Sequence, residues 1–197
     1  MPEKFQNKYR IPSARHQHWN YGWAGSYFIT ICTHQKNNYF GEITDGKMEL
    51  SKVGIIADLM WNEIRYHSKN IRLGKFVVMP NHVHGILTLE KDMDVDSTTT
   101  VETRHALSLP KEDPNSKRKP PKNIGEARYQ NPGKNTISTI IGGYKSTVTR
   151  HSNRLKLNFK WQTRFHDHII RNEESFHQIS NYITNNPKNW EKDKFHQ

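Results

Sequence analysis

Three His-x-His pairs stand out among the 12 histidines of this chain of 197 residues. Alternate residues of a β-strand project from one face, so two imidazoles at this spacing can bind one metal ion together. His16 and His18 lie in a polar segment that would not fix their rings. His166 and His168 could be structural, or could hydrogen-bond to the ligands of a metal site. The pairs are His16–His18, His82–His84 and His166–His168.

His82 and His84 lie in the run VVMPNHVHGILTL, which has the composition of a buried strand. In such a strand Val83 and Leu87 face one way, whereas both histidines and Ile86 face the other. The two imidazoles would then converge from a rigid element. The spacing suits hydrogen-bonded strand histidines equally well, so a further chemical group is needed to decide.

Tyrosine would turn such a metal site into a nuclease, because a phenolate can attack a phosphorus whose oxygen is polarised by a cation. Tyr182 and Asn186 are four residues apart, so on a helix a nucleophile and an oxygen ligand project from one face. The alternative is that Tyr182 is a half-buried packing residue. Tyr144, in IIGGYKSTVTR, is the rival nucleophile, and its place on an apolar helical face favours a core role.

These residues need a scaffold, and the pattern of apolar residues predicts one. Residues 26–33 alternate as in a strand, and residues 39–50 contain the Asp-Gly turn signal of a hairpin. An amphipathic helix is predicted over 52–66, with Ser51 as its N-cap.

Two β-branched runs, 75–79 and 83–89, are separated by a Pro-Asn turn and predict adjacent antiparallel strands. A second helix is predicted from Thr136, with Thr136 or Ser138 as its cap. The run WQTRFHDHII predicts a strand, and residues 173–186 predict a third helix that Pro187 stops. The order strand, helix, two strands, helix, strand, helix predicts an α+β fold, a ferredoxin-like antiparallel sheet with helices packed on one face.

Composition predicts the domain boundaries. Residues 1–25 are polar and basic and predict an N-terminal arm, and residues 191–197 predict a tail. The predicted domain covers 26–190 and is interrupted at 91–134 by a flexible insertion rich in Ser, Thr, Pro and Lys. No run of about 18 apolar residues indicates a membrane span. The single cysteine, Cys32, is expected to be a buried structural thiol.

Thirty Lys and Arg residues against nineteen Asp and Glu give a formal net charge of +11. This charge favours a polyanionic partner, nucleic acid first, although a basic surface without a dedicated partner is the alternative. Aromatic residues beside the cations could stack on unpaired bases or could simply pack in the core. The candidate DNA-contacting residues are Lys145, Arg150, Arg154, Trp161, Arg164, Phe165 and Arg171.

Three motifs resemble those of the REP-associated tyrosine transposases, within the single-tyrosine branch of the HUH endonuclease superfamily. MPNHVHGIL is similar to the family's His-hydrophobe-His motif, WQTRFHDHIIRN to its tryptophan-to-asparagine signature, and NYITNNP to the segment that bears its catalytic tyrosine. The resemblance implies that His82 and His84 bind a divalent metal, Mg²⁺ or Mn²⁺, that Asn186 takes the third ligand position, and that Tyr182 is the nucleophile.

The resemblance also implies a reaction and partners. Tyr182 would attack a phosphate of single-stranded, hairpin-forming DNA, form a 5'-phosphotyrosine and release a 3'-hydroxyl that later rejoins strands. A homodimer and a cytoplasmic protein associated with the nucleoid are expected. Asn186 replaces the glutamine common in the wider transposase family, and imidazoles alone would also suit zinc. The alternatives are a hairpin-binding regulator that does not cleave and an origin nickase, which the WQTRFHDHIIRN signature disfavours.

Overall fold

Strand β3 (Gly25–Cys32) lies inside a four-stranded antiparallel sheet in which the strand order is β6-β7-β3-β8. Its neighbour β7 (His82–Leu89) also has a strand on each side, and β6 (Ile71–Met79) and β8 (His166–Ile170) are the edges. This order, with its intervening helices, confirms the predicted α+β class and ferredoxin-like plan. The computed structural model describes residues 4–5, 8–9, 23–90 and 135–196.

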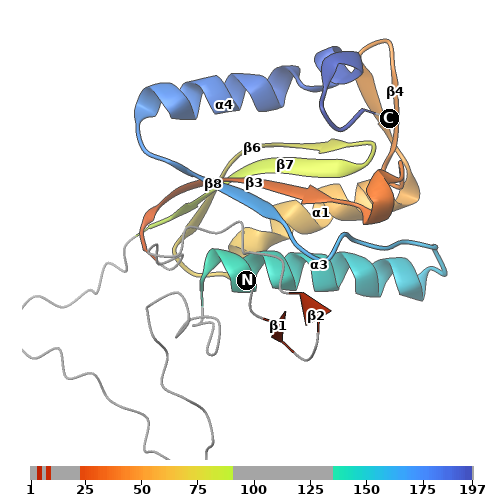
Figure 1. Cartoon of the computed structure of the whole chain (residues 1–197), viewed down its shortest axis with the longest axis horizontal. Coiled ribbons are helices and arrows are strands. Elements are labelled where there is room, and N and C mark those ends of the chain that lie inside the picture. The colour runs from red at the N-terminus through yellow and green to blue at the C-terminus, as the bar shows by residue number, and fades with distance from the viewer. Residues whose placement is uncertain (1–3, 6–7, 10–22, 91–134, 197) are drawn as a thin grey trace, which may run out of the picture.

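The two faces of the sheet carry different helices. On one face, α1 (Lys52–His67) packs beside α3 (Ile137–Arg154), below the sheet in Figure 1. Both helices begin at predicted caps, because the hydroxyls of Ser51 and Thr136 accept hydrogen bonds from backbone amides three residues on. The caps fix where each helix starts, and therefore which of its apolar residues reach the sheet.

The helix α4 (Glu173–Asn185) lies over the opposite face, above the sheet in Figure 1. Thus α1 and α3 form the predicted helical layer, whereas α4 covers the other face. Ile183 is fully buried beneath α4, with Phe176 and Ile179 partly buried against Ile86 of β7. The chain leaves β8 on this side, and α4 then passes over the histidines of β7.

The larger core lies between the sheet and the helices α1 and α3. Trp61 packs against β7 at Gly85, where an added Cβ would lie 2.2 Å from the Trp61 ring. Tyr144 packs edge-on against Trp61, with 5.3 Å between ring centroids. Burial of a large apolar side chain contributes about 1.5 to 3 kcal/mol. This packing therefore fixes β7 at Gly85, between His84 and Ile86.

The β6–β7 hairpin turns at Pro80 and Asn81, as predicted, and it pairs Met79 with His82. Strand β6 begins at Ile71, earlier than the apolar run indicates, because the ladder continues past a register irregularity near its start. His82 is the first residue of β7, directly after the Pro80-Asn81 turn, and this tight turn limits the movement of His82.

A second hairpin confirms the prediction for residues 39–50. It consists of β4 (Gly41–Thr44) and β5 (Lys47–Leu50). Its turn residues, Asp45 and Gly46, have φ angles of 51° and 70°, which suit a two-residue hairpin turn. The short helix η1 (His34–Lys36) lies between β3 and this hairpin.

Only the second half of WQTRFHDHII forms a strand, so the predicted strand is too long. Trp161 makes a single bridge with Thr33, and β8 starts at His166. Before β8 the Nζ of Lys145 donates hydrogen bonds to the backbone carbonyls of Gln162 and Arg164 at 2.6 and 3.5 Å. A lysine from α3 thus holds this irregular segment in place.

The C-terminal segment packs onto the molecule, which corrects the predicted tail at 191–197. After α4 the chain forms η2 (Pro187–Lys192), and Trp190 and Phe195 are buried in a cluster with Cys32 and Met79. Cys32 is buried, as predicted, and burial raises the pKa of its thiol. Two aromatic anchors thus hold the end of the chain against the histidine face.

The remaining predictions concern the N-terminus and the insertion. The insertion at 91–134 and most of the arm lie outside the described residues. Within the arm, β1 (Lys4–Phe5) pairs with β2 (Lys8–Tyr9). None of the helices in the described part of the chain has the length and apolar character needed to cross a membrane.

Candidate active site

The imidazoles of His82 and His84 face the α4 side of the sheet, with 4.4 Å between their ring centroids. The two residues are 0% and 1% exposed. Val83 and Leu87 face the other way and belong to the core under α1 and α3, which is the predicted alternation. The strand therefore brings the two rings together, as a pair of metal ligands requires.

Tyr182 reaches these histidines from α4. Its hydroxyl oxygen lies 3.2 Å from His84 Nε2, and the residue is 41% exposed. The next residue, Ile183, is fully buried and fixes the rotation of the helix about its axis. The phenol is thus close to a buried imidazole and still open to a substrate.

Asp193 is the site residue that sequence reasoning missed. One ligand atom from each of His82, His84 and Asp193 lies within 4.8 Å of the others, which makes the three a candidate metal triad. No short spacing links this carboxylate to the histidines or to the tyrosine motif. The available signal was indirect: Trp190 and Phe195 flank it and indicate a packed segment rather than a tail.

Asn186 also lies at the site, at the C-cap of α4 and 1% exposed. Its Nδ2 donates a hydrogen bond to Asp193 Oδ2 at 2.8 Å. Its backbone is helical, with φ −58° and ψ −43°, although the following Pro187 disfavours that conformation. The predicted third ligand is thus close to the triad and holds the carboxylate in place.

The donor atoms at this site fit a divalent cation. Two buried atoms, His82 Nε2 and Asn186 Oδ1, have no hydrogen-bond partner among the residues that the structure describes. Trp61 Nε1, Ser152 Oγ and Ser180 Oγ are also unpaired among the described residues, but His82 Nε2 and Asn186 Oδ1 belong to side chains that gather around one carboxylate, which favours a group that binds there. Two imidazole nitrogens, a carboxylate and an amide oxygen suit Mg²⁺ or Mn²⁺, and the nitrogens also suit zinc.

Burial keeps both imidazoles neutral. It lowers the pKa of His82 to about 4, and it lowers the pKa of His84 well below its ordinary value, with the nearby His82 acting in the same direction. Burial alone would raise the pKa of Asp193, but hydrogen bonds from Asn186, the Phe195 amide and Tyr182 bring it below its ordinary value. At neutral pH the site therefore offers imidazole lone pairs and one carboxylate.

The Tyr182 phenol is a weaker acid here than in water. Burial and the nearby Asp193 carboxylate raise the pKa of Tyr182 to about 12. The hydroxyl donates a hydrogen bond to Asp193 Oδ2 at 3.0 Å. The phenolic proton is therefore held at a carboxylate oxygen that can accept it.

We expect the metal-free protein to lose stability as the pH falls from 6.5, the ordinary pKa of His82, to about 4, its pKa in the folded protein. The unfolded chain binds a proton in this window and the folded protein does not, so protonation favours unfolding. The His82 contribution to this fall in the free energy of unfolding should be about 3 kcal/mol, and His84, whose pKa is also lowered, acts in the same direction. Urea unfolding with a chelator, above and below the window, measures it.

The control for this pH dependence is His34→Gln, an exposed histidine outside the site. It should keep the wild-type dependence on pH, whereas His82→Gln should reduce it to the part that His84 contributes. An unchanged dependence in His82→Gln would contradict the burial of a neutral imidazole at this position.

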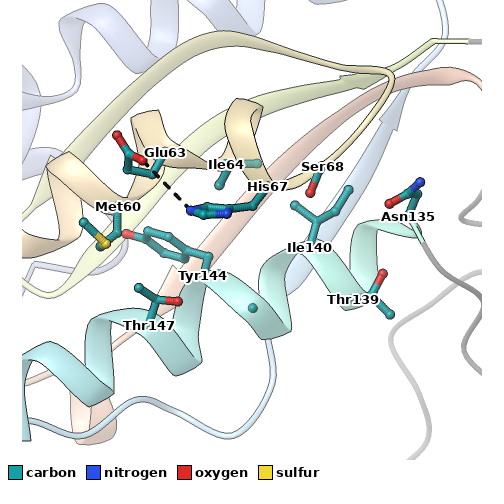
Figure 2. A pocket seen from close by; sticks show the side chains of 11 residues that line it. Met60, Glu63, Ile64, His67, Ser68, Asn135, Thr139, Ile140, Tyr144 and Thr147 are labelled. Carbon is teal, nitrogen blue, oxygen red and sulfur yellow. Dashed lines mark ion pairs between the residues drawn. The ribbon is translucent and has the colours of Figure 1, made fainter.

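A cavity of about 400 Å³ lies between α1 and α3, under the face of the sheet opposite His82 (Figure 2). Ile64, Ile140 and the rival nucleophile Tyr144 line it. The Tyr144 hydroxyl donates to the Ala57 carbonyl at 3.0 Å, the residue is 3% exposed, and burial raises its pKa strongly. Tyr144 is a core residue, as its helical position indicated.

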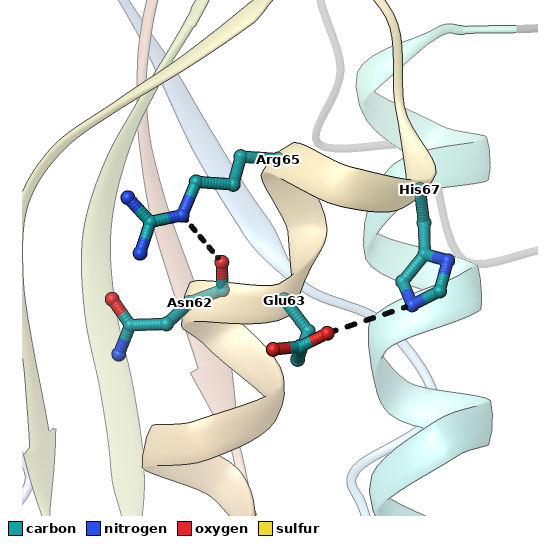
Figure 3. Close-up of polar contacts among 4 residues, drawn as sticks. All are labelled: Asn62, Glu63, Arg65 and His67. Atoms are coloured by element: carbon teal, nitrogen blue, oxygen red, sulfur yellow. Dashed lines mark hydrogen bonds and ion pairs between the residues drawn. The ribbon is translucent and has the colours of Figure 1, made fainter.

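The end of α1 beside this cavity carries surface polar contacts, and of the residues drawn in Figure 3 Glu63 and His67 line the cavity. His67 Nε2 lies 4.0 Å from Glu63 Oε2, with side chains that are 76% and 46% exposed. Arg65 Nε donates to the Asn62 carbonyl at 3.2 Å. Exposed ion pairs of this kind contribute about 0 to 1 kcal/mol. The cavity therefore lacks the buried, converging polar groups of the histidine face.

The predicted DNA-contacting cations divide between the two faces. Arg150 and Arg154 are exposed on α3, on the side of the sheet away from Tyr182. Arg164 and Arg171 are exposed just before and just after β8, the edge strand that β3 separates from the histidines of β7. Contacts with DNA stay predictions for all four.

Trp161 and Phe165 have packing roles in the structure. Trp161 packs against Phe40 and Phe159, and its Nε1 donates to the Lys145 carbonyl at 3.1 Å. Phe165 is partly buried against the same core. Trp161 and Lys145 thus anchor the segment before β8, which is the alternative that the sequence left open for the tryptophan, and a DNA contact by either stays a prediction.

His166 and His168 lie on the same face as the candidate site. They pair with Thr30 and Phe28 of β3, and these two residues contact His84. Directly paired residues of adjacent strands share a face, so the β8 imidazoles project on the Tyr182 side. Both are exposed.

The chain was compared with known sequences and structures. No protein-family model matches it. It is 33% identical over 185 residues to an uncharacterised protein of Haemophilus influenzae, a match that covers 93% of this chain and 92% of that protein. Its structure matches that of a REP-associated tyrosine transposase bound to a REP hairpin, with a TM-score of 0.54 and 16% identity, over 93% of this chain and 77% of that one. This likeness shows a shared fold.

Proposed function

Because the chain belongs to one family with the uncharacterised Haemophilus influenzae protein and has the fold of a REP-associated tyrosine transposase, we propose that it is a metal-dependent, single-strand DNA nicking and joining enzyme with Tyr182 as its nucleophile. One observation carries the proposal: the Tyr182 hydroxyl lies 3.2 Å from His84 Nε2 and 3.0 Å from Asp193 Oδ2. A phenol, two neutral imidazoles and a carboxylate meet at a solvent-open point.

In the proposed reaction the Tyr182 oxygen attacks the phosphorus of a phosphodiester in single-stranded DNA. The bond from phosphorus to the 3'-oxygen breaks, a 5'-phosphotyrosine forms, and the phenolic proton passes to the carboxylate of Asp193. The departing 3'-oxygen takes up a proton from solvent. In the joining step a 3'-hydroxyl loses its proton to solvent and attacks the phosphotyrosine, a phosphodiester forms, and the bond from phosphorus to the Tyr182 oxygen breaks. Asp193 returns its proton to the released phenolate.

His82, His84 and Asp193 would hold the cation, and the unpaired Oδ1 of Asn186 is a further oxygen donor. Mg²⁺ or Mn²⁺ bound there supplies Lewis-acid polarisation of the phosphate. The side chains of the protein hold this arrangement before substrate arrives, because β7 is packed from below and Ile183 anchors α4 from above. Preorganised polar groups of this kind lower the barrier to phosphoryl transfer.

Hairpin-forming DNA is the proposed substrate, and a homodimer stays a prediction from the motifs. The structural neighbour is bound to a REP hairpin, and the formal net charge of +11 favours a polyanion. The decisive experiment incubates the protein with a labelled hairpin oligonucleotide and Mn²⁺. A protein adduct that survives denaturation supports cleavage, whereas hairpin binding without an adduct supports the non-cleaving regulator.

We expect the single strand to cross β8 beside the site, so His166→Ala with His168→Ala should weaken single-strand binding. The two imidazoles can stack on bases or donate to phosphates, and loss of a stacked base contact costs about 1 to 3 kcal/mol, or roughly 5- to 100-fold in affinity. Fluorescence anisotropy with a labelled oligonucleotide measures the effect. Mn²⁺ affinity should not change.

The matched control for the β8 pair is His67→Ala, because His67 is also exposed but lies on α1, on the other side of the sheet. Its affinity for single strands should equal that of the wild type. Equal losses in both variants would show that the imidazoles act only through general charge and hydrogen-bonding capacity, which would refute a path over β8.

A further inference from the structure

The side-chain amide of Asn81 connects His82 with the C-terminal segment. Asn81 is 0% exposed and lies in the β6–β7 turn, directly before His82. Its Nδ2 donates a hydrogen bond to the Phe195 carbonyl at 2.8 Å. Its Oδ1 lies 2.8 Å from His82 Nδ1. One buried amide therefore contacts both the ring of a candidate ligand and the segment that carries Asp193.

The Phe195 carbonyl determines which way this amide points. A carbonyl oxygen can only accept, so the atom of Asn81 that faces it must be the NH₂ group. The oxygen of the amide then faces His82 Nδ1, and because it too can only accept, Nδ1 must carry the hydrogen. A neutral imidazole with a hydrogen on Nδ1 has its lone pair on Nε2, the buried atom that has no partner among the described residues.

His84 is held in a different way. Thr30 Oγ1 lies 2.8 Å from His84 Nδ1, and a hydroxyl can either donate or accept. Thr30 therefore fixes the position of the His84 ring without choosing its tautomer. The Tyr182 hydroxyl, whose hydrogen goes to Asp193, can only accept at His84 Nε2 and so favours a hydrogen there in the metal-free protein. Only at His82 does a buried amide set the tautomer, through the order Phe195 carbonyl, Asn81 amide, His82 ring.

We propose that Asn81 is a positioning residue that fixes the Nδ1–H tautomer of His82, so that the Nε2 lone pair points to the metal position when the C-terminal segment is docked. The proposal rests on the proposed function for the identity of the bound group, a divalent cation. Outer hydrogen bonds of metal-binding histidines typically change metal affinity by about 10- to 100-fold when removed. Docking of Phe195 thereby helps to prepare the ligand set that also includes Asp193.

The first test uses the metal-free protein, with histidine nitrogens observed by NMR above the pKa of the imidazoles. The His82 signals are assigned by their loss in His82→Gln. The wild type should show one tautomer, with Nδ1 protonated. Asn81→Leu should give a mixture of tautomers, and Asn81→Asp, which keeps an acceptor, should restore the Nδ1–H form. A single Nδ1–H tautomer in folded Asn81→Leu would overturn the proposal.

A second variant keeps the test informative if Asn81→Leu does not fold. A chain that ends after Asp193 keeps Asn81 but removes the Phe195 carbonyl, so the amide can turn and the tautomers of His82 should mix. The control is Thr88→Val, because Thr88 makes a hydrogen bond of 2.8 Å with Ser26 elsewhere in the sheet. It should leave the His82 tautomer unchanged. Retention of a single Nδ1–H tautomer in the shortened chain would overturn the proposal.

Metal titration separates this inference from the proposed function. Mn²⁺ affinity, measured by calorimetry, should fall by about 10- to 100-fold in Asn81→Leu and recover in Asn81→Asp. If the wild type forms no DNA adduct while the tautomer responds as described, the nuclease proposal fails and the role of Asn81 stands. If the adduct forms while tautomer and Mn²⁺ affinity are both unchanged in Asn81→Leu, the role of Asn81 fails and the nuclease proposal stands.

Discussion

Tyr182→Phe should abolish the covalent protein–DNA adduct, with a loss of about 1000-fold or more in strand cleavage. Phenylalanine keeps the ring and removes only the hydroxyl oxygen that would become bonded to phosphorus. Because Tyr182 is 41% exposed, loss of its hydrogen bonds should lower the free energy of unfolding by only about 0.5 to 1.5 kcal/mol. Denaturing gels with an end-labelled hairpin and Mn²⁺ measure the adduct.

The matched variant is Tyr144→Phe, which removes a hydroxyl with the opposite environment. That hydroxyl is buried against the Ala57 carbonyl, so its loss should cost about 1 to 2 kcal/mol of stability and leave the adduct intact. An adduct that persists in Tyr182→Phe and disappears in a folded Tyr144→Phe would move the nucleophile to the other face of the sheet. Tyr182→Phe should still bind the hairpin and Mn²⁺.

The sequence predicted the sheet and its helices well because their signals are local. Ser51 and Thr136 cap helices at the predicted positions, and the Asp45-Gly46 and Pro80-Asn81 turns join the predicted strands. Alternation in β7 also placed the side chains of His82 and His84 on one face. Each of these features depends on neighbours within a few residues in the sequence, which is what periodicity and turn chemistry report.

The missed features depend on contacts between distant segments. In the predicted strand WQTRFHDHII, the part before β8 is irregular and is held by Lys145 of another element, which hydrogen-bonds to the carbonyls of Gln162 and Arg164. Asp193 reaches the histidines only because Trp190 and Phe195 are buried against β6 and β3. No spacing rule connects position 193 with position 82, so the carboxylate of the site could not be read from a motif.

These long-range contacts change the expected ligand set, and Asp193→Asn tests the change. The sequence places Asn186 in the third ligand position, whereas the structure groups the carboxylate of Asp193 with the two histidines. Asparagine has the same shape as aspartate but carries no charge, and hard divalent cations bind carboxylates more strongly than amides. Mn²⁺ affinity should therefore fall by about 100-fold or more in Asp193→Asn, above the range for outer hydrogen bonds.

Asn186→Ala should weaken Mn²⁺ binding less than Asp193→Asn does, because Asn186 donates a hydrogen bond that holds the Asp193 carboxylate and can add only a neutral oxygen. Glu191→Gln is the matched control, since it removes the same charge from an exposed residue two positions away. Calorimetric titration of all three variants gives the order of their Mn²⁺ affinities.

A larger loss of Mn²⁺ affinity in Asn186→Ala than in Asp193→Asn would make the amide the third ligand. Equal losses in Asp193→Asn and Glu191→Gln would reduce the role of Asp193 to general electrostatics. The expected order is Asp193→Asn, then Asn186→Ala, then Glu191→Gln, because direct bonding to the cation falls along this series.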